Sequence, residues 1–379
     1  MKRAFFGAGH IAETEIKAGN IPDVIFDNNP ELWGRNFLNV PIAQPTSLAL
    51  EEIDSITICS SSIGDIEKLC QELGFEIENI GASQYLGEFA KTYALEKYRF
   101  DGFISSGLPS RVENLEGGGI FHVSETEPGF ATVEKIFEAN THGCVRDNDD
   151  LVFCAQGHGI VTYNIPSKRV TDVVEIDQGL RPHGVRRMTD GYLIVCTLDD
   201  SVRHYDFDGN LLNTYRISLK KDHLSTAQHH CNDLWVTDHS VYVSMFSISG
   251  NWKLGVFDGG VVEIDRNSSQ LTPVISGLKM PHSVQIHGDT MYVLDSFTGS
   301  VLGHDARPIG VLNGFVRGLA FDQQYVIVGE SKNRNATKMD RGSHLASVDS
   351  RVTIIDPSIG VCRSIQIPNT ISEIHSVVI

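Results

Sequence analysis

The spacing of apolar residues changes character near residue 99. Up to that point, short apolar runs alternate with stretches in which apolar residues recur at helical spacing, which is typical of an α/β unit. Beyond it, short apolar runs alternate with Gly, Asp, Asn and Pro turns, and no long helical pattern follows. We therefore predict a small α/β domain over residues 1–80, a connecting helix over residues 81–98 and a β-rich domain over residues 99–379.

The β-rich region repeats one template. An apolar strand begins nine residues after each of three histidines, His142, His183 and His282. The same offset leads from Asn232 and from Arg317 to a strand. Each unit continues with further short apolar runs, and four antiparallel strands in about 40 residues form one blade of a β-propeller. We call the polar residue that starts each unit its anchor.

The sixth unit is divided between the two ends of this region. Residues 373–379 repeat the His-Ser-Val of an earlier unit, with His375 as anchor, and supply a single strand. The missing strands are expected early in the region, at Phe103–Ser105, Gly119–Val123 and Thr132–Phe137. The sequence thus predicts a mainly β fold, a six-bladed β-propeller closed by its C-terminal strand, because this closure leaves no open sheet edge.

The anchors are expected to meet at one point. In a propeller the first strand of each blade lines the central channel, so equal offsets place the six anchors around one mouth of it. His183, His282 and His375 come from alternate blades, and three imidazoles around one axis suit a divalent metal ion with open coordination positions. Imidazole ligands favour zinc, manganese, iron or nickel over calcium.

The other polar residues near that mouth are predicted to act on a substrate. His142, Asn232 and Arg317 would orient it or supply a base, and the guanidinium suits a carboxylate or sulfate-like group. Asp295 and Glu330, at the ends of second strands, would serve as metal ligands, as partners of an imidazole or as a general base. Two alternatives stay open: the anchors bond the backbone of neighbouring blades, or they bind a substrate without a metal.

The N-terminal region opens as a strand, a glycine turn, a helix and a second strand that ends in an acid. Gly7 and Gly9 would let the backbone approach a phosphate, and Asp27 lies at the spacing suited to a ribose hydroxyl. This order predicts a Rossmann-like domain that binds a nucleotide or a nucleotide-sugar. The pattern stops near residue 80, and Glu13 near the helix start favours the alternative, a docking domain without such a ligand.

Two resemblances to known families sharpen these predictions. Phe6–Gly9, Asp27–Gly34 and Ile56–Ser62 resemble a small Rossmann-like module attached to sugar-pathway methyltransferases and glycosyltransferases. Residues 99–379 resemble an uncharacterised family of bacterial six-bladed propellers, which implies the fold and no particular activity. The motifs that carry this second resemblance are Arg181-Pro182-His183-Gly184, His230-Cys231-Asn232-Asp233, Met280-Pro281-His282-Ser283, Arg317-Gly318-Leu319 and Gly329-Glu330-Ser331. The channel also looks like that of peptidyl-hydroxyglycine lyases, where three blade histidines hold zinc, and of streptogramin lyase with its Pro-His-Gly elements.

Composition limits the partners and the compartment. The formal net charge is −17 at pH 7, so neither nucleic acid nor an anionic membrane is expected as a partner. The start, MKRAFFGAGH, lacks the apolar stretch of a signal peptide, and no apolar run is long enough to span a membrane. The seven cysteines form no CxxC pair and mostly lie in apolar runs. We expect a cytoplasmic protein with reduced thiols.

Together these patterns predict a metal-dependent lyase, hydrolase or isomerase that acts on a small polar substrate, anionic or derived from a sugar. The rival hypothesis is a non-catalytic propeller that binds a glycan or a protein partner, or that assembles with copies of itself. Its N-terminal domain would then serve for docking or for nucleotide binding. An enzyme needs its polar groups arranged around a void, whereas a structural ring is satisfied by neighbouring backbone.

Overall fold

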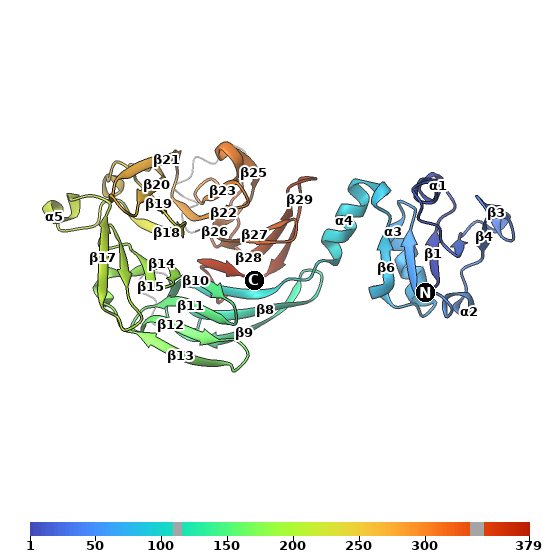
Figure 1. The fold of residues 1–379 in the computed structure, drawn as a ribbon, viewed down its shortest axis with the longest axis horizontal. Coiled ribbons are helices and arrows are strands. Elements are labelled where there is room, and N and C mark those ends of the chain that lie inside the picture. The colour runs from blue at the N-terminus through green and yellow to red at the C-terminus, as the bar shows by residue number, and fades with distance from the viewer. Residues whose placement is uncertain (109–115, 334–344) are drawn as a thin grey trace. The chain divides into compact units, whose positions relative to one another are not determined.

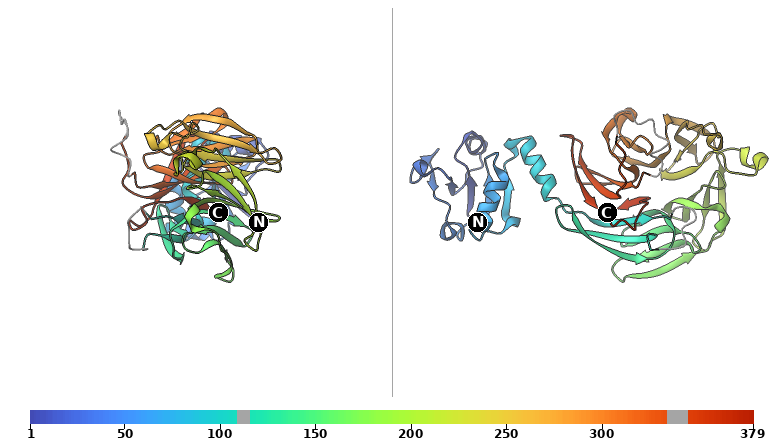
Figure 2. Two further views of the ribbon diagram at one scale, coloured as in Figure 1. Left: turned by 90° about the vertical axis from the view of Figure 1, so that its left-hand side faces the viewer. Right: turned by 180° about the vertical axis from the view of Figure 1, so that it is seen from behind.

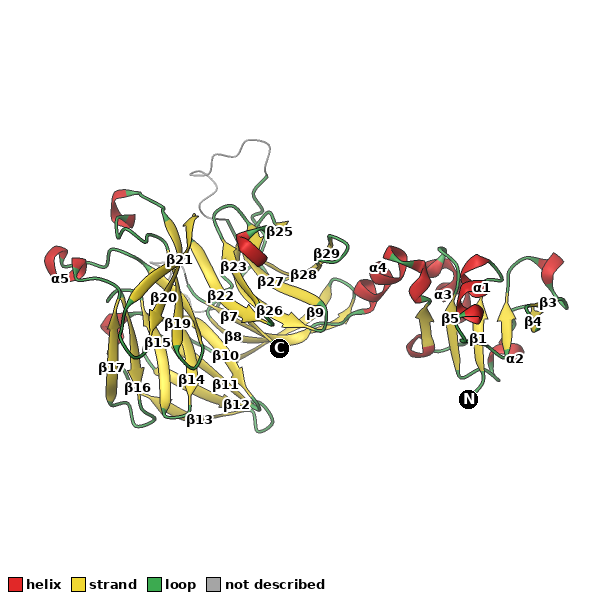
Figure 3. Ribbon diagram, turned by 45° about the horizontal axis from the view of Figure 1, so that its top comes forward, coloured by secondary structure: helices red, strands yellow, loops and turns green. Residues whose placement is uncertain are grey.

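The chain folds into two compact units, Met1–Tyr98 and Arg99–Ile379. The structure is a computed structural model that describes residues 1–108, 116–333 and 345–379. Helices are concentrated in the first unit and strands fill the second (Figures 1 and 3). Within these described parts of the chain, no helix is long and apolar enough to cross a membrane.

The second unit is a six-bladed β-propeller, in which every blade is a four-stranded antiparallel sheet (Figure 1). Blade 1 combines β30 (Ser376–Val378) with β7 (Asp101–Ser106), β8 (Gly119–Glu127) and β9 (Phe130–Phe137). Blade 2 contains β10 (Thr141–Asp147), β11 (Asp150–Ala155), β12 (Gly159–Asn164) and β13 (Arg169–Val174). Blade 3 contains β14 (Pro182–Met188), β15 (Gly191–Cys196), β16 (Ser201–Tyr205) and β17 (Leu211–Arg216).

The other three blades follow in chain order. Blade 4 contains β18 (Cys231–Val236), β19 (Ser240–Met245), β20 (Gly259–Asp265) and β21 (Leu271–Leu278). Blade 5 contains β22 (Pro281–His287), β23 (Thr290–Asp295), β24 (Ser300–Leu302) and β25 (Pro308–Val311). Blade 6 contains β26 (Phe315–Asp322), β27 (Tyr325–Ser331), β28 (Arg351–Asp356) and β29 (Val361–Gln366). A short helix, α5 (Lys220–Leu224), follows blade 3.

Face-to-face packing of the blades explains why the inner strands read as continuous apolar runs. Every residue of β15 is buried, as are all but the first of β11. Such strands are covered on both faces, so polar residues cannot alternate with apolar ones along them. The outermost strand of blade 2, β13, is exposed except at its last residue, Val174. The central position of a strand in its blade therefore decides its composition.

The C-terminal strand closes the ring. Strand β30 pairs antiparallel with β7, with Ser376 opposite Ser105 and Val378 opposite Phe103. Figure 2 shows this red strand beside the cyan strands that begin the propeller. The expected closure and the count of six blades are both present.

A buried ion pair also joins the last blade to the first. Arg363 on β29 donates from Nη2 to Oε2 of Glu125 on β8 over 2.8 Å. The same carboxylate accepts hydrogen bonds from the backbone N–H groups of Gly129, at 2.8 Å, and Phe100, at 3.1 Å. Burial acts to raise the pKa of Glu125, but these bonds, led by that from Arg363, hold it below its ordinary value. The carboxylate is therefore charged and needs its cation.

We expect Arg363→Met to lower the free energy of unfolding by about 3 kcal/mol, because it leaves a charge buried without a partner. Urea unfolding would measure this. The matched control is Arg216→Met, which breaks an exposed pair with Asp222 and should cost less than about 1 kcal/mol. Equal stability of Arg363→Met and the wild type would show that the pair does not help to close the ring.

The first unit is a mixed sheet with few helices. Its strand order is β3-β4-β2-β1-β5-β6, with β3 antiparallel to β4 and the other pairs parallel. The strands are β1 (Arg3–Phe6), β2 (Val24–Phe26), β3 (Asn36–Phe37), β4 (Val40–Ala43), β5 (Ser55–Ile58) and β6 (Ile80–Ala82). The helices are α1 (His10–Lys17), α2 (Ser47–Leu50), α3 (Ile63–Glu72) and α4 (Glu88–Lys97). The Rossmann-like assignment is not confirmed by this mixed sheet.

The segment expected to be a connecting helix, residues 81–98, lies within the first unit. It includes the end of β6, a 3-10 turn at Gln84–Leu86 and helix α4. Leu86 and Tyr93 are buried in the same apolar core as Ala4 of β1 and Ile56 of β5. These contacts make the segment part of the packed unit.

Candidate functional site

The anchors lie beside irregularities in the first strands of their blades. In blades 2 and 3 the pairing register shifts across His142 and His183. It shifts likewise across Asn232 in blade 4, and directly after His282 and Arg317 in blades 5 and 6. A β-bulge bends its strand and redirects a side chain. The recurring irregularity therefore gives the anchors a common direction that a regular strand would not.

The first strands approach each other so closely at this level that only glycine fits beside two anchors. A Cβ atom on Gly143 would lie 2.2 Å from the backbone oxygen of His183. A Cβ atom on Gly184 would lie 2.9 Å from the Cα atom of Asp233. Neither distance leaves room for a side chain. Packing between the backbones of neighbouring blades thus fixes the anchors.

The anchors converge on one chamber of about 470 Å³, at one end of the channel. Five of them line it: His142, His183, His282, Arg317 and His375. The sixth, Asn232, lies in an adjoining neck of about 20 Å³ that the four histidine anchors share. The remaining lining residues are Leu108, Arg181, His230, Phe246, Trp252, Met280, Phe315 and Glu373.

A second ring of lining residues has no counterpart among the predicted site residues. Its members lie two positions before an anchor and are Arg181, His230, Met280, Phe315 and Glu373. The sequence repeat could have predicted these residues, because each of them lies two positions before an anchor. Three successive members have positive φ: 48° at Arg181, 54° at His230 and 55° at Met280. Such a conformation costs a non-glycine residue on the order of 1 kcal/mol or more, and it clusters at functional sites.

The two halves of the chamber differ in polarity. On the polar half, the ring of His142 stacks on His183, with centroids 4.1 Å apart, and lies 4.5 Å from the ring of His375. There Glu373 accepts from Nη1 of Arg317 over 3.0 Å and lies 3.2 Å from Nε2 of His375. This half offers charge and hydrogen bonds.

The opposite half is aromatic. The ring of His230 stacks on Phe246 at 4.2 Å and lies 4.6 Å from Trp252. The ring of His282 meets Phe246 at 5.2 Å and Phe315 at 5.6 Å, both edge to face. Nε1 of Trp252 is buried and has no hydrogen-bond partner among the described residues. The chamber therefore suits a molecule with a charged end and a flat, less polar face.

Three of the chamber histidines are held neutral at pH 7. Burial lowers the pKa of His142, His183 and His282 well below 6.5, and neighbouring imidazoles and arginines lower it further. Nδ1 of His282 lies 3.0 Å from the backbone oxygen of Met280. A carbonyl only accepts, so Nδ1 carries the proton and Nε2 of His282 keeps its lone pair.

Two further polar groups at the chamber lack partners among the described residues. Nε2 of His183 is buried without a hydrogen bond. The guanidinium of Arg181, which lines the chamber and is half-buried, makes no hydrogen bond or ion pair with any described residue. A buried polar group without a partner is costly, and a partly buried charge even more so. The guanidinium of Arg181 therefore suits an anion that enters the chamber, and Nε2 of the neutral His183 suits a polar group of the same ligand.

Two predicted acids are not brought to the chamber lining. Glu330 lies on β27, where Arg351 donates to both carboxylate oxygens and the N–H of Gly314 donates to Oε2 over 2.8 Å. Asp295, at the end of β23, accepts from the N–H of Lys279 over 2.9 Å, and burial raises its pKa to about 6. The side chains of both acids bond locally. The acid that lines the chamber is Glu373.

Asn232 fits the structural alternative for an anchor. Its Nδ2 donates to the backbone oxygen of Pro281 over 3.1 Å and to that of His230 over 3.2 Å. The first of these bonds links blade 4 to blade 5. Asn232 therefore joins neighbouring blades and does not face the chamber.

The predicted metal ion does not fit the side-chain geometry. Among the described residues, no group of three or more His, Cys, Asp or Glu side chains is placed to hold a metal ion. His183, His282 and His375 line the same chamber, but the ring of His142 packs against the rings of His183 and His375. A metal site needs its donor atoms to point at one position.

The predicted nucleotide site in the first unit is occupied by its own acid. Oδ2 of Asp27 accepts a hydrogen bond from the N–H of Ala8, between Gly7 and Gly9, over 2.8 Å. Oδ1 accepts from the N–H of Asn29 over 2.8 Å. The N–H group that would face a phosphate is thus taken by a carboxylate, which would repel one.

Comparisons with known proteins add a family. A family model described as "Domain of unknown function (DUF4915)" matches residues 171–379, more than half of the chain. The chain belongs to this family. The matched DUF4915 region includes the second ring and five of the six anchors, and His142 precedes it. A search of curated proteins finds no match.

Solved structures share the propeller fold. The structure described as "Crystal structure of Nidogen/Laminin Complex" is 10% identical with a TM-score of 0.50, and the match covers 74% of this chain and 98% of that chain. "Streptogramin B lyase structure" is 10% identical with a TM-score of 0.44, covering 74% and 91%. The designed Ika8 protein is 12% identical with a TM-score of 0.40, covering 73% and 90%. Identities this low show the fold alone.

The lowered histidine pKa values predict a loss of stability in mild acid. Below about pH 6.5 these histidines bind protons in the unfolded chain but not in the folded chamber. The free energy of unfolding therefore falls by about 1.4 kcal/mol per pH unit for each such histidine. We expect urea unfolding between pH 7 and about pH 5.5 to show this fall, and His183→Asn to make it shallower. His10→Asn, at a histidine with an 85% exposed side chain, is the control and should leave the slope unchanged. A slope that is the same in His183→Asn would refute the buried neutral imidazole.

Proposed function

We propose that the propeller is an enzyme that binds a small sugar acid in the chamber and acts on it by proton transfer, in a lyase or isomerase step. Arg181 carries this proposal, because its guanidinium faces the chamber without a counter-charge among the described residues. An arginine fork binds a carboxylate through two parallel hydrogen bonds. Binding of an anion there would supply the missing partner.

The rest of the chamber suits a hydroxylated ring. Neutral imidazoles both donate and accept hydrogen bonds, as sugar hydroxyls require. Phe246, Trp252 and Phe315 form an apolar wall opposite the polar half, and Nε1 of Trp252 remains available to donate. The C–H face of a sugar ring would lie against this wall while its carboxylate points to the arginine.

His282 has the properties of a general base. Its Nδ1 is bonded to the backbone oxygen of Met280 and lies 2.7 Å from Oγ of Ser296, which fixes the ring. Its Nε2 keeps a lone pair, and the lowered pKa leaves that nitrogen unprotonated at pH 7. The hydrogen on the carbon next to the substrate carboxylate would pass to Nε2 as a proton, and its bonding electron pair would stay on the substrate as an enediolate that Arg317 and Arg181 stabilise. Return of a proton to that carbon would complete an isomerisation, and departure of a hydroxyl group from the adjacent carbon would complete a lyase step.

The arrangement around a void favours an enzyme over a purely structural ring. Asn232 donates to the backbone of a neighbouring blade, whereas the other five anchors line the chamber. A non-catalytic glycan-binding propeller remains the rival, and it requires the same chamber without proton transfer. For the first unit we propose docking to a protein partner, because Asp27 already bonds the backbone that a nucleotide would need.

Binding can be read from a tryptophan in the chamber. The protein has three tryptophans, Trp33, Trp235 and Trp252, so the double variant Trp33→Phe/Trp235→Phe keeps only the chamber reporter. We expect glucuronate to change its fluorescence saturably and glucose, the neutral match, to do so weakly. Arg181→Gln should weaken glucuronate binding at least about tenfold, or roughly 1.4 kcal/mol. Equal affinities of glucuronate and glucose, unaffected by Arg181→Gln, would count against a carboxylate site.

Proton transfer can be followed as exchange with solvent. In D2O we expect the enzyme to replace the hydrogen on C5 of glucuronate, next to the carboxylate, with loss of its proton NMR signal. His282→Gln should slow this exchange about a hundredfold, since a general base contributes that much, while binding at the Trp252 reporter persists.

A chelator separates this reaction from the metal-dependent alternative. Exchange that continues in EDTA supports proton transfer without a metal. Exchange that EDTA stops and added zinc restores would replace our proposal by the metal-dependent one. Binding without any exchange would favour the glycan-binding propeller.

A further inference from the structure

The channel opens at its other end into a cup of about 840 Å³, built from the far ends of the same first strands. The order along β14 shows the relation: Arg181 lines the chamber, His183 and Gly184 line the neck, and residues 186–189 line the cup. All residues that form the cup lie within the described parts of the chain. The cup is therefore separate from the proposed reaction site.

Arg186 in the cup has no ion-pair partner among the described residues, although the charge of Asp233 acts on its pKa. Its one side-chain hydrogen bond to a described residue runs from Nη1 to the backbone oxygen of Val185 over 2.8 Å. The guanidinium lies over the ring of Trp235, 5.2 Å from its centroid. Burial lowers the pKa of Arg186, which shows how poorly water compensates its charge. Stacking on an aromatic ring holds the fork in place without satisfying its remaining donors.

The neighbouring arginine in the cup, Arg187, is neutralised by two carboxylates. Nη1 of Arg187 lies 3.2 Å from Oδ2 of Asp147 and 3.5 Å from Oδ2 of Asp150. By contrast, Oδ1 of Asp233, an acid in the same cup as Arg186, accepts a hydrogen bond from the N–H of Leu234 over 2.8 Å. Asp233 and Arg186 form no ion pair in the described structure, although both are desolvated and each affects the other's pKa. The geometry thus keeps the fork of Arg186 open.

A second polar group in the cup needs a donor. Oε1 of Gln285, on the neighbouring first strand β22, is buried and has no hydrogen-bond partner among the described residues. An anion alone cannot satisfy it, because a carboxylate oxygen also only accepts. A molecule that bonds Arg186 and Gln285 together must carry a negative group and a hydroxyl or amine hydrogen.

We propose that the cup is a second binding site, for a small hydroxylated monocarboxylate. The carboxylate would take the open fork of Arg186 beside Trp235, and a hydroxyl would donate to Oε1 of Gln285. Asp147 and Asp233 in the same cup disfavour a ligand with several negative charges. The proposal is independent of the function assigned to the chamber, because it uses none of the chamber residues.

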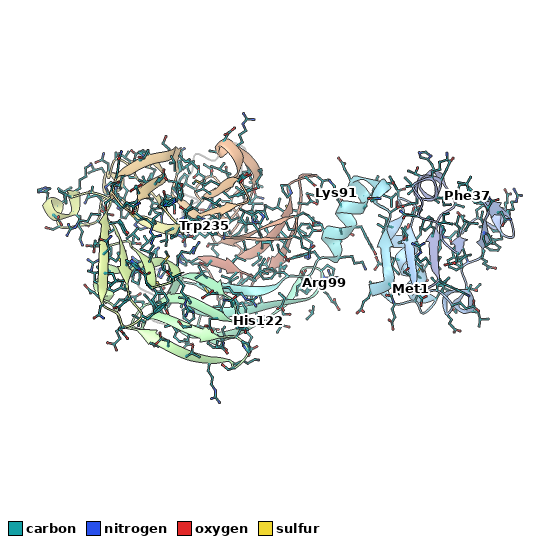
Figure 4. The ribbon with its side chains drawn as sticks, viewed as in Figure 1. Met1, Phe37, Lys91, Arg99, His122 and Trp235 are labelled. Atoms are coloured by element: carbon teal, nitrogen blue, oxygen red, sulfur yellow. The ribbon has the colours of Figure 1, made fainter. Side chains whose placement is uncertain are left out.

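Trp235 serves as the reporter, and it lies on the inner strand β18 (Figure 4). The variant Trp33→Phe/Trp252→Phe keeps it as the sole tryptophan. We expect D-gluconate to change its fluorescence saturably, whereas sorbitol, the matched neutral polyol, and propionate, a carboxylate without hydroxyls, bind at least about tenfold more weakly. Arg186→Gln should remove the response, and Arg181→Gln, in the chamber, should leave it unchanged.

Each result decides the proposal. A Trp235 signal that gluconate does not change, or that Arg186→Gln does not weaken, overturns it. Equal binding of gluconate and propionate removes the role of Gln285, and Gln285→Leu with unaltered selectivity does the same. If Arg186→Gln fails to fold by circular dichroism, Arg186→Lys keeps the charge without the fork, and it should weaken gluconate at least about fivefold. If the Arg181→Gln variant lost the response of Trp235 to gluconate, the two cavities would be one site.

Discussion

Close contact between the first strands around the axis is the constraint on which the rest of the propeller depends. Gly143 and Gly184 show how little space remains, since a single added carbon would meet backbone of the next blade. Strands that come this near cannot stay regular, and their pairing shifts at or beside the anchor in five blades. The bulges redirect polar side chains inward, and one narrow neck divides the channel into two cavities.

The charge along this channel is opposite to that of the chain as a whole. The protein carries a formal charge of −17, yet each cavity is lined by an arginine that forms no ion pair with a described residue. These arginines are Arg181 in the chamber and Arg186 in the cup. Low-dielectric walls strengthen such local charges, so the channel attracts anions that the outer surface would repel. Neutral imidazoles between the two arginines avoid a larger buried positive charge, which their lowered pKa values express.

Position in the sequence does not show which acids are available to a ligand in this protein. Asp27 and Glu330 stand where a ligand-binding acid was expected, and both are held by local bonds, to the N–H of Ala8 and to Arg351. Glu373 was not expected at the site, yet it lines the chamber and contacts Arg317 and His375. A carboxylate is available to a ligand only when backbone donors and cations nearby leave it so.

The sequence by itself determined the propeller, its six blades, the closing strand and the meeting of the anchors. It could do so because every blade must solve the same packing problem, so one spacing recurs from His142 to Arg317. Only the tertiary structure decided which side chains face a void. The unpaired fork of Arg181, the fixed proton of His282 and the local bonds of Asp295 depend on partners from other strands or on backbone direction. Sequence spacing places a residue on a face, whereas hydrogen-bond partners and burial, which come from distant segments, decide what that residue can do.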